Sequence, residues 1–177
     1  PEALGPGHAA SKEALQPSAY WGNEKIWDTH ANNHNGMLDQ DGRVWLAATG
    51  FKPQNPDFCK KGSDHPSAKV FPLDSSVRRI AMYDPKTKVY TPYQTCFQTH
   101  HLHFGYDQDN TVWASGGGQV LGWLNTRLLL QTGDVKKAQG WTPLILDTNG
   151  NGKRDEWVEP NQAVDPNKDK RIIASFY

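Results

Sequence analysis

The chain uses one strand–turn–strand pattern twice. Residues 39–50 have the sequence DQDGRVWLAATG, and residues 107–118 have the sequence DQDNTVWASGGG. At a constant separation of 68 positions (107 − 39), the matched residues are Asp39, Asp41, Val44, Trp45 and Gly50 in the first copy and Asp107, Asp109, Val112, Trp113 and Gly118 in the second. A repeated unit of this kind predicts a repeat architecture.

Composition and turn chemistry indicate short strands. The 177 residues include 16 Gly, 12 Pro and 7 Trp, which favours strands joined by many turns over a helical protein. Gly42 suits the positive φ that the first Asp-rich turn needs. Besides a short strand at 25–30, the pattern predicts strands at 34–38, 43–48, 78–83, 88–93, 99–106, 111–115, 120–125 and 142–146. One short helix is expected within 126–140, with Asp134 as a candidate N-cap.

These strands divide the chain into an irregular lead-in at 1–24 and two units at about 25–93 and 94–177. Each unit has about four antiparallel strands, the arrangement of a β-propeller blade. The 68-residue spacing exceeds the ~40–50 residues of a usual blade, and a Pro-rich insertion at 50–76 explains the excess. Because a propeller closes with ~4–8 blades, we expect an all-β fold of propeller type with about two blades. The rest of the propeller would come from the same protein or another chain, and both ends of the sequence are expected to be cut points.

Three segments carry a resemblance to a known family. HNGMLDQDGRVWLAATG and HHLHFGYDQDNTVWASGGG resemble the blade signature of the streptogramin lyase-like (virginiamycin B lyase-like) β-propellers, and RRIAMYDPKTKVYTPY resembles their outer hairpin. The similarity is greatest to large secreted bacterial members and extends over about residues 20–177. His34 occupies the family's His position, whereas Leu102 stands at the equivalent place in the second copy. The resemblance implies a propeller in which a channel His and Mg²⁺ open a lactone by elimination.

Histidines precede both turns and are the candidate catalytic residues. In a strand, His101 and His103 project to one face. We expect His34, His101 and His103 to converge at a channel mouth, where they would bind Mg²⁺ or another divalent metal, or act as general acid and base. His100 is a weaker candidate. Alternatively these histidines are structural and bond strand ends across blades. The enzyme hypothesis requires that the three side chains face one solvent-accessible cavity.

A second candidate metal site is the loop that begins at Asp147, within an Asp- and Asn-rich segment at 147–170. Its sequence, DTNGNGKRDE, presents oxygen-bearing residues at alternating positions followed by Gly, which is the pattern of a Ca²⁺ loop. The candidate ligands are Asp147, Asn149, Asn151, the backbone carbonyl of Lys153, and Asp155. Position 12 is Val158, with Glu159 one residue late, and the stretch Asp165–Asp169 repeats the alternation without Gly. The alternative is a solvated turn, which Asp and Asn also favour.

The cysteine content and the charge of the chain indicate where the protein is located and which partners it has. Cys59 and Cys96, the only cysteines, lack a CxxC or haem motif and are expected to form a disulfide, which would indicate a periplasmic or secreted protein. The 19 basic and 19 acidic residues include no basic tract for nucleic acid, and no apolar run is long enough for a membrane span. Trp45 and Trp113, at matched positions, are both expected in the core. The function expected is a lyase-like enzyme acting on a small molecule, and the alternative is a non-catalytic binding or scaffold propeller stabilised by Ca²⁺ and the disulfide.

Overall fold

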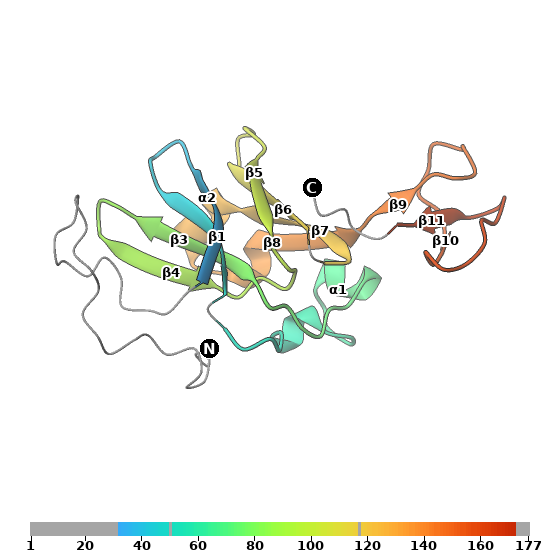
Figure 1. Cartoon of the computed structure of the whole chain (residues 1–177), viewed down its shortest axis with the longest axis horizontal. Helices are drawn as coiled ribbons and strands as arrows, with labels where there is room; N and C mark the ends of the chain where they lie inside the picture. The colour runs from blue at the N-terminus through green and yellow to red at the C-terminus, as the bar shows by residue number, and fades with distance from the viewer. Residues whose placement is uncertain (1–31, 50, 117, 173–177) are drawn as a thin grey trace.

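The computed structural model describes residues 32–49, 51–116 and 118–172, and the expected lead-in and strand at 25–30 lie outside them. The described chain is mostly antiparallel β-sheet with a few short helices, as the all-β prediction requires. Figure 1 shows two four-stranded sheets side by side and a small third sheet that projects beyond them. None of the helices in this part of the chain is long and apolar enough to cross a membrane.

The first sheet has the order β1-β2-β3-β4, and each strand pairs with its neighbour in the chain. Its strands are β1 (Asn32–Leu38), β2 (Val44–Thr49), β3 (Arg79–Asp84) and β4 (Val89–Tyr93). The β1–β2 turn ends at Gly42, whose φ of 83° is the left-handed conformation expected there. Asp39 closes this turn by accepting hydrogen bonds from the backbone N–H groups of Asp41 and Arg43, both at 2.9 Å.

The second sheet repeats this arrangement with the order β5-β6-β7-β8. Its strands are β5 (His101–Phe104), β6 (Thr111–Ser115), β7 (Val120–Asn125) and β8 (Gln139–Pro143), with α2 (Thr126–Thr132) and α3 (Val135–Ala138) between the last two. The predicted cap at Asp134 is confirmed, because its side chain accepts a hydrogen bond from the backbone N–H of Lys137. The single helix expected over 126–140 is wrong, because Gly133 (φ 69°) ends α2 in the left-handed conformation.

The main core lies between the two sheets and is asymmetric. The first sheet contributes the face that carries Trp45, Ile80 and Met82, while the second contributes the face that carries Val112 and Ala114. The opposite face of β6 carries Trp113, which is 36% exposed, whereas Trp45 is 0% exposed. The expectation that both tryptophans are buried is therefore wrong for Trp113. In the first copy, this side of the strand packs against the neighbouring sheet. In the second copy, none of the described sheets covers it.

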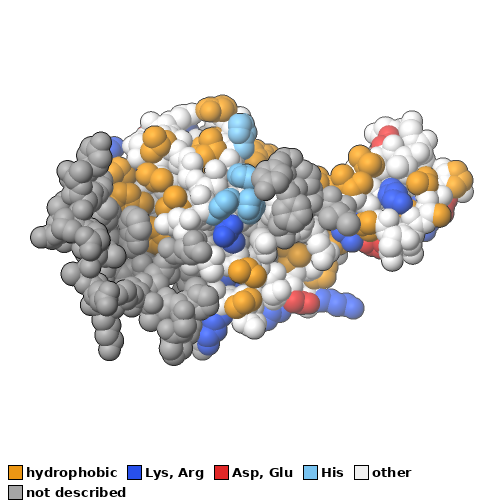
Figure 2. All heavy atoms as spheres, in the orientation of Figure 1, with side chains coloured by type: hydrophobic (Ala, Val, Ile, Leu, Met, Phe, Trp, Pro, Cys, Tyr) orange, Lys and Arg blue, Asp and Glu red, His pale blue; other side chains and the backbone are white. Residues whose placement is uncertain are grey.

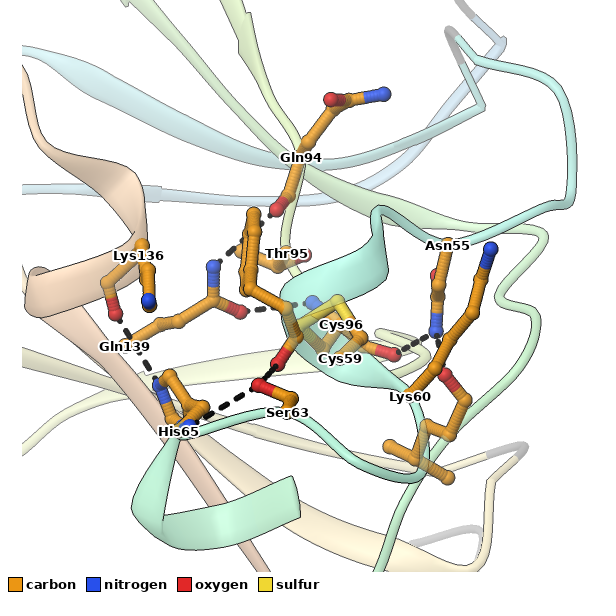
Figure 3. The surroundings of a disulfide bond; sticks show 12 residues. Asn55, Cys59, Lys60, Ser63, His65, Gln94, Thr95, Cys96, Lys136 and Gln139 are labelled. Carbon is orange, nitrogen blue, oxygen red and sulfur yellow. Dashed lines mark hydrogen bonds between the residues drawn. A yellow bond between two sulfur atoms is a disulfide. The ribbon is translucent and has the colours of Figure 1, made fainter.

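The insertion between β2 and β3 is held in place by a disulfide and by the buried side chain of Arg79, which donates hydrogen bonds to carbonyls of the insertion. It contains η2 (Asp57–Cys59) and α1 (Pro66–Val70). Cys59 is bonded to Cys96, which confirms the predicted pair, and both side chains are fully buried. Figure 3 shows Asn55 donating to the carbonyl of Cys96, and the Gln139 side chain accepting from the Cys96 N–H. The insertion thus packs against the chain that joins the two sheets.

The third sheet has the order β10-β11-β9 and consists of β9 (Ile145–Leu146), β10 (Trp157–Val158) and β11 (Asp169–Arg171). Two boundaries differ from the prediction here. The strand expected at 142–146 is divided, because β8 ends its pairing at Pro143, which has no N–H for a further ladder bond, and β9 pairs instead with β11. The segment expected to be loop over 147–170 contains β10, which runs parallel to β11.

Candidate functional site: a histidine cluster between two sheets

An irregularity in β1 places His34 at the contact with the second sheet. The pairing of β1 with β2 shifts register between Asn33 and Gly36, and such bulges redirect the side chains within them. His34 and Asn35 are the residues in this interval. The Asn35 side-chain oxygen accepts a hydrogen bond of 3.0 Å from the N–H of Leu102 in β5. This bond joins β1 to β5 directly beside His101.

Three histidines meet at this junction. One ring nitrogen from each of His34, His100 and His101 lies within 4.8 Å of the other two. The His34 ring centroid is 4.1 Å from that of His100 and 5.7 Å from that of His101. The Nδ1 atoms of His100 and His101 are 3.2 Å apart. Figure 2 shows histidine side chains gathered on this face of the molecule, and His34 is exposed while the other two are half-buried.

Electrostatics keep one member of this cluster neutral near physiological pH. Burial lowers the pKa of His100 below its ordinary value of 6.5, and positive charge on His34, His101 and Arg78 lowers it further. A neutral imidazole is the form that binds a metal or accepts a proton. His100 is therefore available for either role without a change of protonation at neutral pH.

The cluster differs from the predicted set by one residue. His34 and His101 come together as expected, but His103 is not a member. It lies two residues further along β5, exposed, with its ring 6.4 Å from that of Tyr106. His100 takes the third place because it precedes β5 and is not bound by strand alternation; its N–H donates to the carbonyl of Ser115. The adjacency of His100 to His101 in the sequence was the signal that indicated it.

The donor set selects the kind of metal. Three imidazole nitrogens suit Zn²⁺, Cu²⁺, Ni²⁺ or Fe²⁺, whereas Mg²⁺ takes oxygen ligands. No carboxylate belongs to the group among the described residues, so these residues do not fit the Mg²⁺ that the family resemblance implies. A tetrahedral Zn²⁺ requires ligand nitrogens about 3.3 Å apart; the Nδ1 atoms of His100 and His101 are 3.2 Å apart, and one nitrogen from each of the three rings lies within 4.8 Å of the others. The arrangement can hold a transition-metal ion with coordination positions left open.

Two hollows on the described surface lie away from the histidine cluster. One is lined by the insertion and Gln94, and another by Asp147, Asp169 and their neighbours. Neither of these two contains a histidine, so neither is the cavity that the enzyme hypothesis requires. The residues expected to bind Ca²⁺ from Asp147 to Asp155 form one loop between β9 and β10, beside the second hollow.

Comparison with known proteins adds no further constraint. No family model, no curated protein and no solved structure matches the chain.

Proposed function

We propose that the protein binds a divalent transition-metal ion, such as Zn²⁺, through His34, His100 and His101. The observation that carries this proposal is the convergence of their three ring nitrogens within 4.8 Å. Three protein ligands leave one position of a tetrahedral ion for water or a ligand, which is the arrangement of catalytic rather than structural zinc sites. The ion would be bound where the two sheets meet.

Calorimetric titration with Zn²⁺ tests the site. We expect one ion per chain, and an affinity at least about tenfold lower in H100A or H101A, since loss of even an outer-shell partner costs that much. H103A is the matched control, because His103 lies in the same strand but outside the cluster. Equal affinity in H101A and wild type would show that the cluster does not hold the ion.

A lyase-like reaction on a small molecule is the function that we propose for this site. It is supported by the coordination position that three ligands leave open, where a bound ion would polarise a carbonyl oxygen of the substrate and make the neighbouring C–H more acidic. His100 and His101 would act in this reaction as ligands of the ion. Replacement of His100 and His101 by alanine should abolish turnover of a substrate once one is identified, and unchanged turnover would refute the lyase.

The alternative is a non-catalytic binding or scaffold protein. It is favoured by the exposure of His34 and by the disulfide that braces the fold. On this hypothesis, Zn²⁺ raises the melting temperature, and no variant of the cluster alters any reaction rate. The disulfide supports a secreted or periplasmic setting, which we also propose.

We further propose that the two sheets are consecutive blades of a β-propeller. Support comes from the way in which the two sheets pack, because opposite faces of the two copies are in contact. The face of the first sheet that carries Trp45 packs against the face of the second that carries Val112. Continuation of this pattern would seat another sheet on the face that carries Trp113 and Trp123, whose rings lie 5.8 Å apart. If the proposal is right, Trp113 becomes protected from fluorescence quenchers in an assembly that includes the neighbouring sheet. Unchanged quenching there would contradict it.

The loop from Asp147 to Asp155 is proposed to bind Ca²⁺. Its backbone supports this, because Asp147 accepts hydrogen bonds from the N–H groups of Gly150 and Gly152 and so wraps the loop around its first carboxylate. The positive φ angles of the two glycines, 74° and 72°, permit this turn. Calcium titration of the whole chain tests the loop.

A further inference from the structure

The loop between β9 and β10 lacks one ligand. Side-chain oxygens at positions 1, 3, 5 and 9 of a calcium loop come here from Asp147, Asn149, Asn151 and Asp155. The bidentate carboxylate that normally completes such a loop at position 12 is absent, since that position is Val158. An incompletely ligated Ca²⁺ would bind weakly, so the source of a further carboxylate decides whether the loop is a site.

The neighbouring acid in the sequence is already engaged. Glu159 accepts hydrogen bonds from Arg171, with Nε at 2.7 Å, and from the Trp157 indole at 3.2 Å. Arg171 Nη2 lies 2.6 Å from the same carboxylate, and the Arg171 side chain is largely buried. These contacts hold the pKa of Glu159 below its ordinary value, with the bond from Arg171 as the main cause. Glu159 therefore braces β10 against β11.

Asp169 supplies what the loop lacks. It is the first residue of β11, is 1% exposed, and its Oδ1 has no hydrogen-bond partner. Its other oxygen, Oδ2, accepts a bond of 2.7 Å from the backbone N–H of Asp155, which is the ninth residue of the loop. Pairing of β10 with β11 puts Asp169 opposite Trp157, which precedes Val158 at position 12 of the loop. A buried carboxylate with an unpartnered oxygen is costly unless a cation or donor satisfies it.

The surroundings of Asp169 are open to an ion. Asp169 and Asp147 line the same hollow, together with Gly152 and Lys153. The loop is also fixed to the segment before β11 at its first turn, where the Thr148 hydroxyl donates to the carbonyl of Lys168 (3.0 Å). Both ends of the loop are thus anchored to the chain that carries Asp169.

We propose that Asp169 is the closing carboxylate ligand of a Ca²⁺ site formed with Asp147, Asn149, Asn151 and Asp155. This rests on the calcium loop proposed above and adds a ligand from a separate strand. The side-chain amides of Asn149 and Asn151 both donate to Asp155 Oδ2, so these three side chains already lie against one another. The carboxylates of Asp147, Asp155 and Asp169 do not form a group within 4.8 Å among the described residues, so the ion draws them together as it binds.

Calorimetric titration of the full chain with Ca²⁺ tests this assignment. We expect wild type to bind one ion and D169N to bind at least about tenfold more weakly. D165N is the matched control, because Asp165 lies in the same segment and its carboxylate accepts the N–H of Asn167, outside the proposed ligand set. In the presence of a chelator, D169N should melt at or above the wild-type temperature, because the substitution removes a buried charge with an unpartnered oxygen.

The outcomes separate the two proposals. Wild-type affinity in D169N overturns the role of Asp169 and leaves the loop site standing, whereas no calcium binding by wild type overturns both. If D169N does not fold, ¹³C spectra of the wild-type carboxyl carbons replace it. Calcium should then shift the Asp169 signal and leave the Asp165 signal in place, and an unmoved Asp169 signal refutes the proposal.

Discussion

The buried guanidinium of Arg79 offers the sharpest test of how the insertion is held. Arg79 is 1% exposed and donates to five acceptors, none of which is a carboxylate. The acceptors are the carbonyls of Thr95, Lys52, Pro53 and Gln54 and the side-chain oxygen of Asn55. Burial lowers the pKa of Arg79 to about 10, so the group stays charged at neutral pH. We predict that R79M destabilises the fold severely.

The magnitude follows from which acceptors regain water. Lys52, Pro53 and Gln54 are exposed, so their carbonyls can be hydrated once the guanidinium is gone. Thr95 and Asn55 are buried and cannot, and a hydrogen bond to a charged group contributes about 1.5–3 kcal/mol net. Two such bonds give a loss of about 3–6 kcal/mol in the free energy of unfolding. That is a large share of the 5–15 kcal/mol typical of a domain.

Urea denaturation followed by tryptophan fluorescence measures this loss. R78M is the control, because the neighbouring Arg78 is only half-buried and its Nε has no hydrogen-bond partner. The slope of the transition should be unchanged, so that the shift of its midpoint reports stability. A loss below about 1 kcal/mol in R79M, or an equal loss in R78M, would refute the reasoning.

Three further predictions use the same assay or its thermal equivalent. Replacing Cys59 and Cys96 by alanine should lower the free energy of unfolding by about 4 kcal/mol in the chain-entropy model, given their separation of 37 residues; a midpoint insensitive to this change would contradict it. Burial opposes the charge on Asp39, but hydrogen bonds from Trp45 and from the turn outweigh burial and lower its pKa in the folded state below the ordinary 3.8. Asp39 should therefore stabilise the fold above pH 3.8, and this contribution should be lost as the pH falls further. In D39N the melting temperature should therefore fall less steeply between pH 5 and pH 2 than in wild type, by about the contribution of one carboxylate. An equally steep fall in D39N and wild type would exclude this role. W45A should cost about 3–5 kcal/mol and W113A about 1 kcal/mol, since only Trp45 is fully buried; equal losses would show that the face of Trp113 is covered.

The repeated motif, together with the strand patterns around it, predicted two units of about four antiparallel strands, and the structure has two four-stranded sheets. Alternation and turn residues mark strands such as β6 and β7, whose predicted and observed bounds coincide. The third sheet was missed because β9 and β10 are only two residues long and too short to show any period. The burial of Trp113 was predicted wrongly because a sequence match reports the position in a strand, whereas burial depends on whether a neighbouring sheet covers that face.

The site was predicted in part for a similar reason. His34 and His101 could be paired because both precede a turn in their own copy of the motif. The choice between His100 and His103 depends on how the chain enters β5, and strand alternation does not describe a residue before the strand. The contact of Asp169 with the loop that begins at Asp147 could not be predicted, because it depends on the parallel pairing of β10 with β11.

The segment between the two sheets affects the entropic cost of binding an ion at the proposed histidine site. Cys96 is bonded to the insertion, and three residues later the N–H of Thr99 donates to the carbonyl of Arg78, the residue immediately before β3. A connection pinned at both places is no hinge, so His34 and His101 keep their separation before any ion arrives. Such preorganisation lowers the entropic cost of binding. If the histidines bind Zn²⁺ as proposed, the disulfide at Cys96 should raise that affinity from a distance, and the ratio of Zn²⁺ affinities in the oxidised and reduced chain measures this effect.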